Sequence, residues 1–353
     1  MNNLKSLSHY NEVASNKILS FSKKSSFIPS NFHENIGNKW AEHEDILKNF
    51  KNKKIEKIEY SFLDLKIEIA DKILEHCILC EKRCNINRNF KKGDCGIIKP
   101  RIASEFFNSN EEIILNENYT CNQNKLCSTG WSEEYPLAPS HRMLFAGCNM
   151  DCAFCQNHDI SNNPKNGKFV EISDLALKID IARKNGSKNI NFIGGEPSLN
   201  LAYILKVMRI TKENIPVVLN TNMYMSIESM NLLNGFIDLY LTDFKFGNNQ
   251  CASRLSGVNN YMEIIGRNHK IAINSGSMII RHLVLPNHIE CCSIPIIDWI
   301  YENLGTNVAL NIMGNYTPLN ESLKYEDISK PITSCETSKV INYAKDLGFE
   351  IIS

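Results

Sequence analysis

The sequence predicts an α/β protein, a partial (β/α)6 barrel with a cysteine-rich extension on its N-terminal side. From about residue 141 onward, short apolar runs alternate with amphipathic helical patterns, which is typical of β/α units around a parallel sheet. Six such units suit a partial barrel better than a complete barrel of eight. Closely spaced cysteines precede this region in a polar segment, which predicts a metal-binding extension.

Each predicted strand is a short apolar run bounded by polar or glycine-containing segments. The candidate strands are residues 143–146, 189–193, 216–219, 236–241, 278–285 and 307–312. Apolar residues at helical spacing predict one helix over 201–208 and another over 340–347, which ends at Gly348. The chain has neither an internal repeat nor a dinucleotide-binding glycine motif.

The first part of the chain is expected to be a lead that ends in a docking helix. Residues 1–60 are rich in Asn, Ser and Lys without a sustained period, so we expect loose order with one helix near residues 40–50. Ser61 and Asp64 resemble a capping box, and apolar residues follow at helical spacing. We therefore divide the chain into a lead (1–75), a cysteine-rich metal-binding segment with an insertion (76–140) and the barrel (141–353).

Composition and charge exclude several classes of protein. The 353 residues are 43% hydrophobic, which suffices for one large core and a smaller unit. Lys plus Arg and Asp plus Glu both number 39, so no overall charge attracts nucleic acid or an anionic membrane. The N-terminus shows no signal-peptide pattern, and no apolar stretch approaches the roughly 18 residues of a membrane-spanning helix. We expect a cytoplasmic protein with no nucleic-acid partner and no membrane partner.

Thirteen cysteines, an odd number, indicate metal ligands rather than disulfides in such a protein. Cys148, Cys152 and Cys155 form a C-x3-C-x2-C motif after the first predicted strand. Three thiolates can bind three irons of a [4Fe–4S] cubane and leave the fourth iron open to an external ligand. A closed zinc site would need a fourth ligand, for which His141 or His158 would have to serve. The spacing favours the iron–sulfur interpretation.

This spacing resembles the motif of the radical S-adenosylmethionine (SAM) superfamily, whose members often place an aromatic residue where Phe154 stands. Residues 147–157, with Ile160 and Ser161, are similar to the pyruvate formate-lyase activating enzyme-like group. Residues 281–286 and 313–318 look like later blocks of that group, and the resemblance covers about residues 76–353. It implies a barrel of radical SAM type, a [4Fe–4S] cluster and SAM as cofactors, with Phe154 near the adenine.

Polar groups follow the second and third predicted strands, at the strand ends where β/α barrels build active sites. Gly194 and Gly195 allow backbone to approach a ligand closely, and Glu196 can accept a hydrogen bond from an ammonium group. The resemblance implies that this segment binds the amino group of SAM; a simple turn is the alternative. By the same resemblance Asn220 and Thr221 lie near the ribose or methionine part of SAM, with a capping role as the alternative.

Charged residues mark the next two strands. Asp243 and Lys245 are two residues apart, so they point to one face. Activating enzymes carry a similar Asp-x-Lys, which implies that Lys245 neutralises the SAM carboxylate while Asp243 orients it; a surface ion pair is the alternative. Arg281 and His282 are adjacent in a strand, so at most one of them faces the barrel. The resemblance favours Arg281 as the inward residue, which leaves His282 in the outer layer.

A second cysteine group, here called the N-terminal box, lies in a short polar segment. Its four thiolates can close a zinc site or a second iron–sulfur cluster, and a similar box recurs in the resembled group. Zinc, a cluster and unligated thiols all stay open as alternatives. The box consists of Cys77, Cys80, Cys84 and Cys95.

The other cysteines show no ligand spacing. Compared with the resembled group, the chain has an insertion between Ser104 and Glu133, and Tyr135 replaces a proline. Two cysteines of the insertion are further ligands or free thiols; these are Cys121 and Cys127. Four later cysteines are expected to be buried thiols without a metal; these are Cys251, Cys291, Cys292 and Cys335.

The function implied by the resemblance is that of a radical SAM oxidoreductase. Such an enzyme cleaves SAM reductively to methionine and a 5′-deoxyadenosyl radical, which abstracts hydrogen from a substrate. The substrate would be a glycine of a partner glycyl-radical enzyme, or a peptide or small molecule, and the sequence does not choose between them. A flavodoxin or ferredoxin is the expected electron donor. The alternative from another class is a non-catalytic iron–sulfur or zinc protein, against which Glu196, Asp243 and Lys245 argue.

Overall fold

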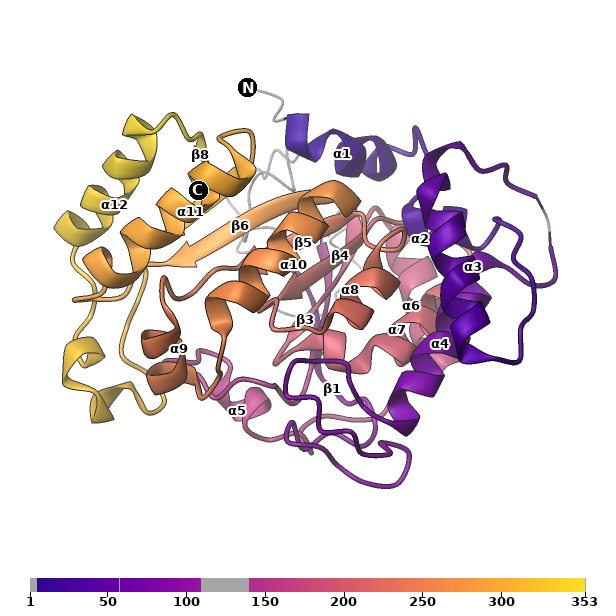
Figure 1. The fold of residues 1–353 in the computed structure, drawn as a ribbon, viewed down its shortest axis with the longest axis horizontal. Helices are drawn as coiled ribbons and strands as arrows, with labels where there is room; N and C mark the ends of the chain where they lie inside the picture. The colour runs from indigo at the N-terminus through magenta and orange to yellow at the C-terminus, as the bar shows by residue number, and fades with distance from the viewer. Residues whose placement is uncertain (1–4, 57, 109–139, 353) are drawn as a thin grey trace.

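The structure is a computed structural model that describes residues 5–56, 58–108 and 140–352. Its strands are β1 (Ile102–Asn108), β2 (Ser140–Phe145), β3 (Asn189–Gly194), β4 (Val217–Thr221), β5 (Leu239–Asp243), β6 (Ser277–Leu283), β7 (Ala309–Met313) and β8 (Ile351–Ile352). They form one eight-stranded sheet in chain order (Figure 1). β1 is antiparallel to β2, and every later neighbouring pair is parallel.

The helices alternate with the parallel strands, so each strand from β2 to β7 is followed by at least one helix. The α-helices are α1 (Ser8–Ala14), α2 (Phe21–Ser25), α3 (Ile36–Lys48), α4 (Phe62–Glu75), α5 (His158–Ser161), α6 (Ile172–Lys184), α7 (Leu201–Ile210), α8 (Ile227–Leu233), α9 (Asn249–Ser256), α10 (Tyr261–Ser275), α11 (Ile294–Leu304) and α12 (Ser334–Asp346). Short helical turns are η1 (Lys5–Leu7), η2 (Phe50–Asn52), η4 (Pro197–Asn200), the π-helical η5 (Ile289–Ser293), η6 (Ser322–Lys324) and η7 (Glu326–Ile328).

The structure confirms the α/β fold and the six strands predicted from the apolar pattern, with ends that differ by a few residues. The predicted helices are also present: α3, α4, α7 and α12. Two strands lie outside the prediction. β1 is an antiparallel edge strand and β8 has only two residues, so neither carries the long apolar run of a buried parallel strand.

Local hydrogen bonds explain where the helices begin and end. The Ser61 hydroxyl accepts from the Asp64 N–H at 3.2 Å, while Asp64 accepts from the Ser61 N–H at 2.8 Å, which completes the predicted capping box of α4. α12 ends shortly before Gly348, whose φ of +90° lies in the region that favours glycine.

On the side formed by β4 to β8, the barrel interior changes from apolar to polar along the strands. An apolar cluster fills the end near the strand N-termini and consists of Leu7, Tyr10, Val218, Leu239, Leu241, Ile279, Ala309 and Ile352. Asn220 follows Val218 by two positions and Arg281 follows Ile279 by two, so both point to the same interior. Polar side chains therefore face the interior nearer the C-terminal ends of the strands.

The lead differs from the loose segment that we expected, because it closes the N-terminal end of the barrel. The Tyr10 hydroxyl lies 2.6 Å from Asn189 Nδ2, which donates to it, and the Phe21 N–H donates to Asp238 at 2.8 Å. Figure 1 shows α1 across the top of the strands and α5 near the opposite side of the molecule. α1 has only 7 residues, too few for a sustained period, and it is ordered by burial against the barrel.

The division at residues 75 and 140 stays a proposal. Helices of the proposed lead pack directly on the barrel, as the contacts of α2 and α4 with α7 show. The insertion cysteines Cys121 and Cys127, with Tyr135, lie outside the described residues. Within the described residues, no helix is long and apolar enough to cross a membrane.

Asp238 tests whether the lead contributes to stability. Its carboxylate is fully buried and lies 2.8 Å from the Val217 N–H, the Phe21 N–H and His9 Nε2. Asp238→Ala leaves these buried groups unpartnered and should lower the free energy of unfolding by about 2–4 kcal/mol. Thermal unfolding followed by circular dichroism measures the change. Asp45→Ala, at an exposed position of α3, is the control, and equal melting temperatures for the two variants would contradict the assignment.

Candidate active site

The first cysteine motif lies on the loop from the end of β2 to α5, here called the cysteine loop (residues 146–157). Gly147 begins it with φ +88°, and a Cβ at this position would lie 2.5 Å from Ile97. Burial and the neighbouring Cys152 raise the pKa of Cys148 well above its ordinary value. Burial also raises the pKa of Cys152 to about 12, although nearby Lys245 opposes this. The thiols are thus neighbours in a partly shielded environment, where a bound metal can replace their protons.

Backbone hydrogen bonds hold the cysteine loop in place. The Asp151 N–H donates to the Ser256 carbonyl at 3.0 Å, and the Ala153 N–H donates to the Leu255 carbonyl at 2.8 Å. From the other side, the Glu321 N–H donates to the Ala153 carbonyl at 2.9 Å. The end of α9 and the segment after β7 therefore fix the loop between its cysteines.

Phe154 is almost completely buried beside the last cysteine of the motif. Its ring lies edge-on to Phe246 at 5.9 Å and to Tyr316 at 6.3 Å between ring centroids. Phe246 comes directly after Lys245, so this aromatic contact joins the cysteine loop to the chain that leaves β5.

Gly194 and Gly195 bring the end of β3 against the start of the cysteine loop. The Gly195 N–H donates to the Phe145 carbonyl at 2.8 Å, and the Glu196 N–H donates to the Gly147 carbonyl at 2.9 Å. A Cβ on Gly195 would lie 2.1 Å from the Gly147 oxygen, and Gly194 has φ +126°. The two glycines permit a backbone contact that a larger residue would prevent.

Glu196 is fully buried and directed towards the end of β4. Its Oε1 accepts from the Thr221 hydroxyl at 2.9 Å and from the Ser198 N–H at 3.0 Å, while Oε2 accepts from the Asn222 N–H at 2.9 Å. Burial raises the pKa of Glu196 despite these bonds. A nearby cation would therefore favour its ionised form.

Asn222 links the end of β4 to the cysteine loop. Its Nδ2 donates to Asn149 Oδ1 at 2.8 Å and lies 3.6 Å from the Cys148 sulfur. Thr221 and Asn222 therefore hold Glu196 and the first cysteine in one hydrogen-bond network. The role of Asn222 in this network was not predicted from the sequence.

Asp243, Lys245 and Arg281 meet where β5 and β6 end. Asp243 accepts from Lys245 Nζ at 2.6 Å and from Arg281 Nη2 at 2.7 Å. Burial disfavours the carboxylate, but Arg281 and Lys245 outweigh it and lower the pKa of Asp243. The side chains of Asp243 and Lys245 are only 17% and 21% exposed, so the pair is not a surface ion pair. Arg281 Nη2 also donates to Asn220 Oδ1 at 2.5 Å.

His282 lies in the outer layer of the barrel, on the opposite side of β6 from Arg281. Its Nδ1 is 2.9 Å from the Phe244 carbonyl and its Nε2 is 2.8 Å from the Ser293 hydroxyl. Both ring nitrogens therefore have partners, and burial lowers the pKa of His282 to about 4.

Two inward residues were missed in the sequence analysis. The Ser140 hydroxyl donates to Asn189 Oδ1 at 2.9 Å inside the barrel, and Arg142 and Asn191 lie two positions further along the same strands. Both are buried, and among the described residues the Asn191 amide has no hydrogen-bond partner. Burial and the charge of Arg281 lower the pKa of Arg142 to about 10. A polar residue at every second position of a buried strand could have revealed them.

The N-terminal box lies beside the cysteine loop. The Ser229 hydroxyl donates to the Leu79 carbonyl at 2.8 Å, which ties the box to the start of α8. Burial and the nearby Cys95 raise the pKa of Cys80 to about 12, against a hydrogen bond to Asn149 of the cysteine loop. Burial raises the pKa of Cys95, and the two remaining box cysteines, Cys77 and Cys84, raise it further. The four box thiols are thus neighbours.

Cys292 is buried as expected, but Cys251 is only half-buried and Cys291 is exposed. These cysteines and His288 place their ligand atoms within 4.8 Å of one another. Cys335 is exposed rather than buried. The spacing of these residues in the sequence did not reveal the cluster, because the possible ligands come from separate elements that only the fold brings together.

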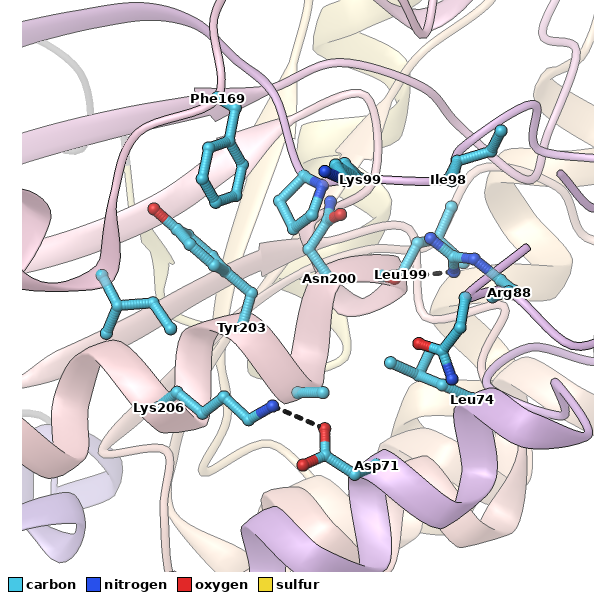
Figure 2. Close-up of a pocket in the computed structure, with 14 residues that line it drawn as sticks. Asp71, Leu74, Arg88, Ile98, Lys99, Phe169, Leu199, Asn200, Tyr203 and Lys206 are labelled. Carbon is cyan, nitrogen blue, oxygen red and sulfur yellow. Dashed lines mark hydrogen bonds and ion pairs between the residues drawn. The ribbon is translucent and has the colours of Figure 1, made fainter. Parts of the chain in front are cut away.

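A cavity of about 340 Å³ lies between α4, α7 and the chain around the N-terminal box (Figure 2). Figure 2 shows Lys206 paired with Asp71 at one side, where Nζ and Oδ1 are 2.7 Å apart, and Arg88 near Leu199 at another. No residue of the cysteine loop lines this cavity, so it is separate from the candidate active site.

Comparison with known proteins agrees with this geometry. The Radical SAM superfamily matches residues 143–300, which include the cysteine loop. The chain is 39% identical over 332 residues to the uncharacterized protein MJ0674 of Methanocaldococcus jannaschii, a match that covers 89% of this chain and 88% of that protein. MJ1227 of the same organism, whose name gives a glycyl-radical enzyme activating enzyme as a proposed function, is 32% identical over 90 residues, 25% of this chain and 35% of that protein.

Among solved structures, Streptococcus suis SuiB is 17% identical, with a TM-score of 0.44 over 61% of this chain and 48% of SuiB. The chain thus spans about half of SuiB and about a third of MJ1227, but most of MJ0674. The family match shows that residues 143–300, which contain the cysteine loop and most of the barrel, form a radical SAM domain.

Proposed function

We propose that Cys148, Cys152 and Cys155 hold the [4Fe–4S] cluster of this radical SAM enzyme, and that a glycyl-radical enzyme is its hydrogen donor. One observation carries the proposal: the three-cysteine loop lies directly beside the half-buried ion pair of Asp243 and Lys245 at the barrel mouth. A non-catalytic metal protein would have no need of half-buried charges there. When bound, the cluster supplies one electron for the cleavage of SAM to methionine and a 5′-deoxyadenosyl radical.

The donor set fits such a cluster. Three cysteines on one loop provide three thiolates and leave one iron open to SAM. The alternative zinc site would recruit His141 or His158. His141 is instead bonded to Glu105 at 3.0 Å, and His158 contacts Asp159 at 3.1 Å. Each histidine therefore has a carboxylate partner of its own, which supports the iron–sulfur assignment.

Charged groups of the chain would hold the amino-acid part of SAM. Lys245 now pairs with Asp243, and a ligand carboxylate would share its ammonium group. Asp243 keeps Arg281 as a second partner, so it stays ionised when Lys245 turns to the ligand. Glu196, with Gly194 and Gly195 before it, would face the SAM ammonium group.

Other residues would orient SAM and exclude water. Asn220 and Thr221 would contact the ribose or methionine part, and the Nδ2 atom of Asn220 has no hydrogen-bond partner among the described residues. Phe154 would lie near the adenine. The apolar cluster that contains Leu7 and Tyr10 closes the other end of the barrel, which would limit access of water to the radical.

The assignment of a glycyl-radical enzyme rests on two observations. The cysteine loop resembles the activating-enzyme group, and a 90-residue match joins the chain to MJ1227. Hydrogen abstraction from a peptide or a small molecule is the alternative. We propose a flavodoxin or ferredoxin as the electron donor.

Cys152→Ala tests the cluster assignment. Anaerobically reconstituted wild-type protein should be brown and form 5′-deoxyadenosine from SAM with dithionite, measured by chromatography. The variant should form none, because a missing ligand leaves an incomplete cluster. Cys335→Ala, at an exposed cysteine on α12, should match the wild type. Equal losses in both variants, or a colourless wild type that contains only zinc, would contradict the assignment.

The hydrogen donor can be tested with the same reaction. A glycyl-radical enzyme from the same cells should acquire a glycine-centred radical, seen by electron paramagnetic resonance, only when wild-type protein and SAM are both present. If 5′-deoxyadenosine forms but no candidate glycyl-radical enzyme acquires a radical, the proposed substrate is wrong, while SAM cleavage itself stands.

Lys245→Ala should mainly weaken the binding of SAM. Losing one charge-assisted hydrogen bond to a carboxylate costs about 1.5–3 kcal/mol, roughly ten- to a hundredfold in affinity. Calorimetric titration of the reconstituted protein with SAM measures the change. Lys345→Ala, at an exposed lysine of α12, is the matched control. Unchanged SAM affinity in Lys245→Ala would remove Lys245 from the binding site.

The N-terminal box is proposed to serve structure or electron transfer rather than SAM cleavage itself, because four thiolates leave no open iron. Changing Cys80 and Cys84 together to Ser should remove one metal site and lower the folding yield. The soluble fraction should still form 5′-deoxyadenosine with dithionite, a strong chemical reductant. A fraction that keeps the cluster spectrum but forms no 5′-deoxyadenosine would place the box in the catalytic machinery.

A further inference from the structure

Three cysteines and one histidine converge near the C-terminal ends of β5 and β6, outside both cysteine groups that the sequence identifies. Cys251 lies in the first turn of α9, His288 directly precedes η5, and Cys291 and Cys292 lie within η5. We propose that these four residues form a closed site for a single Zn²⁺ ion. The site is independent of the proposed radical chemistry.

The distances among the ligand atoms match one tetrahedral ion. With Zn–S near 2.3 Å and Zn–N near 2.05 Å, tetrahedral geometry places two sulfurs roughly 3.8 Å apart and a nitrogen roughly 3.6 Å from each sulfur. The Cys291 sulfur lies 4.0 Å from that of Cys251 and 3.9 Å from that of Cys292. His288 Nδ1 lies 3.6, 3.3 and 3.7 Å from the sulfurs of Cys251, Cys291 and Cys292.

The ligand types select zinc. Three thiolates and one imidazole form a Cys3His set, which is a structural zinc set with all four positions filled by protein. Soft thiolates in a tetrahedral arrangement disfavour magnesium and calcium, which prefer oxygen ligands. His288 and Cys292 are buried, with 3% and 1% of their surface exposed, so two of the four ligands are shielded from water.

The histidine is oriented as a metal ligand. His288 Nε2 lies 2.9 Å from Asp327 Oδ2, so the ring can donate its proton to this carboxylate and leave the Nδ1 lone pair for the ion. Arg254, on the same helix as Cys251, pairs with Asp327 and fixes the carboxylate. Three thiolates and Zn²⁺ carry a net negative charge, and the Asp327 carboxylate adds a second one; the guanidinium of Arg254 offsets part of this charge.

The sulfurs also receive support from Asn248, the capping residue of α9. Its Nδ2 donates to the Cys251 sulfur at 3.3 Å and to the Cys291 carbonyl at 2.7 Å. The π-helical turn η5 presents Cys291 and Cys292, which are adjacent in sequence, to the same point. Gly247 allows this approach, since a Cβ there would lie 2.5 Å from the Cys292 carbonyl oxygen.

A disulfide does not account for this arrangement. All three cysteines are free, and a disulfide between two of them would leave the third sulfur and His288 Nδ1 without a reason to converge. A single ion explains all four side chains at once.

The proposed ion would brace the cysteine loop indirectly. α9 carries Cys251 at one end, and its other end accepts hydrogen bonds from Asp151 and Ala153. Asp327 belongs to the segment after β7, which also binds Ala153 through the Glu321 N–H. The ion would therefore join two of the elements that fix the loop.

Zinc content provides the first test. The full-length protein is purified anaerobically, and zinc per chain is measured by mass spectrometry of the elements for wild type, for Cys251→Ser combined with Cys291→Ser, and for Cys335→Ser. The double variant should contain one zinc fewer than both other proteins, whatever the N-terminal box binds. Equal zinc in all three soluble proteins would overturn the proposal. Iron at the cysteine loop is measured separately, so failure of the cluster assignment gives a different result.

Thiol reactivity provides a second test that needs no variant. Cys291 and Cys335 are both exposed. In zinc-loaded wild-type protein, iodoacetamide should modify Cys335 at least about tenfold faster than Cys291, because a metal-bound thiolate is protected. A zinc chelator should remove the difference. Equal rates in the presence of zinc, or a disulfide at Cys291 in the anaerobic protein, would overturn the proposal.

Discussion

The candidate active site depends on the close backbone contact between the Gly194-Gly195 turn and the chain that enters the cysteine loop. A Cβ on Gly195 would lie 2.1 Å from the Gly147 oxygen, and the Glu196 N–H donates to this same oxygen at 2.9 Å. The contact fixes the start of the loop at the barrel mouth. It also turns Glu196 towards Thr221 and Asn222, so the loop and the carboxylate are positioned by one constraint.

Charge inside the barrel is concentrated at the strand ends that adjoin this loop. Burial of an unpaired charge is costly, and Asp243 is tolerated because Lys245 and Arg281 flank it. Arg142 adds a further positive charge. Burial and the charge of Arg281 lower the pKa of the Arg142 guanidinium to about 10. The positive charges of Lys245, Arg281 and Arg142 outnumber the negative charge of Asp243 in this part of the barrel. This excess supports the proposal that an anionic group, such as the SAM carboxylate, binds there. The apolar cluster closes the opposite end of the barrel.

Three cysteine groups converge on one loop, and their geometry suggests different tasks. The motif cysteines lie on the loop itself, and the N-terminal box contacts it through Asn149. The Cys251 group reaches it through α9, whose last residues bind the backbone of Asp151 and Ala153. Only the Cys251 group, among the described residues, gathers its ligand atoms within 4.8 Å, as a single ion requires. The loop that we propose to hold a cluster is thus supported from both sides.

The barrel strands and the cysteine motif could be predicted from the sequence alone, because both depend on residues close together in the chain. Apolar runs and helical periods are local, and so are the spacing of Cys148, Cys152 and Cys155 and the capping box at Ser61. Two features required the tertiary structure: the aperiodic lead closes the barrel, and Cys251 meets His288. These features depend on distant segments becoming neighbours, and the strand register and helix packing that bring them together are set by burial of the whole chain.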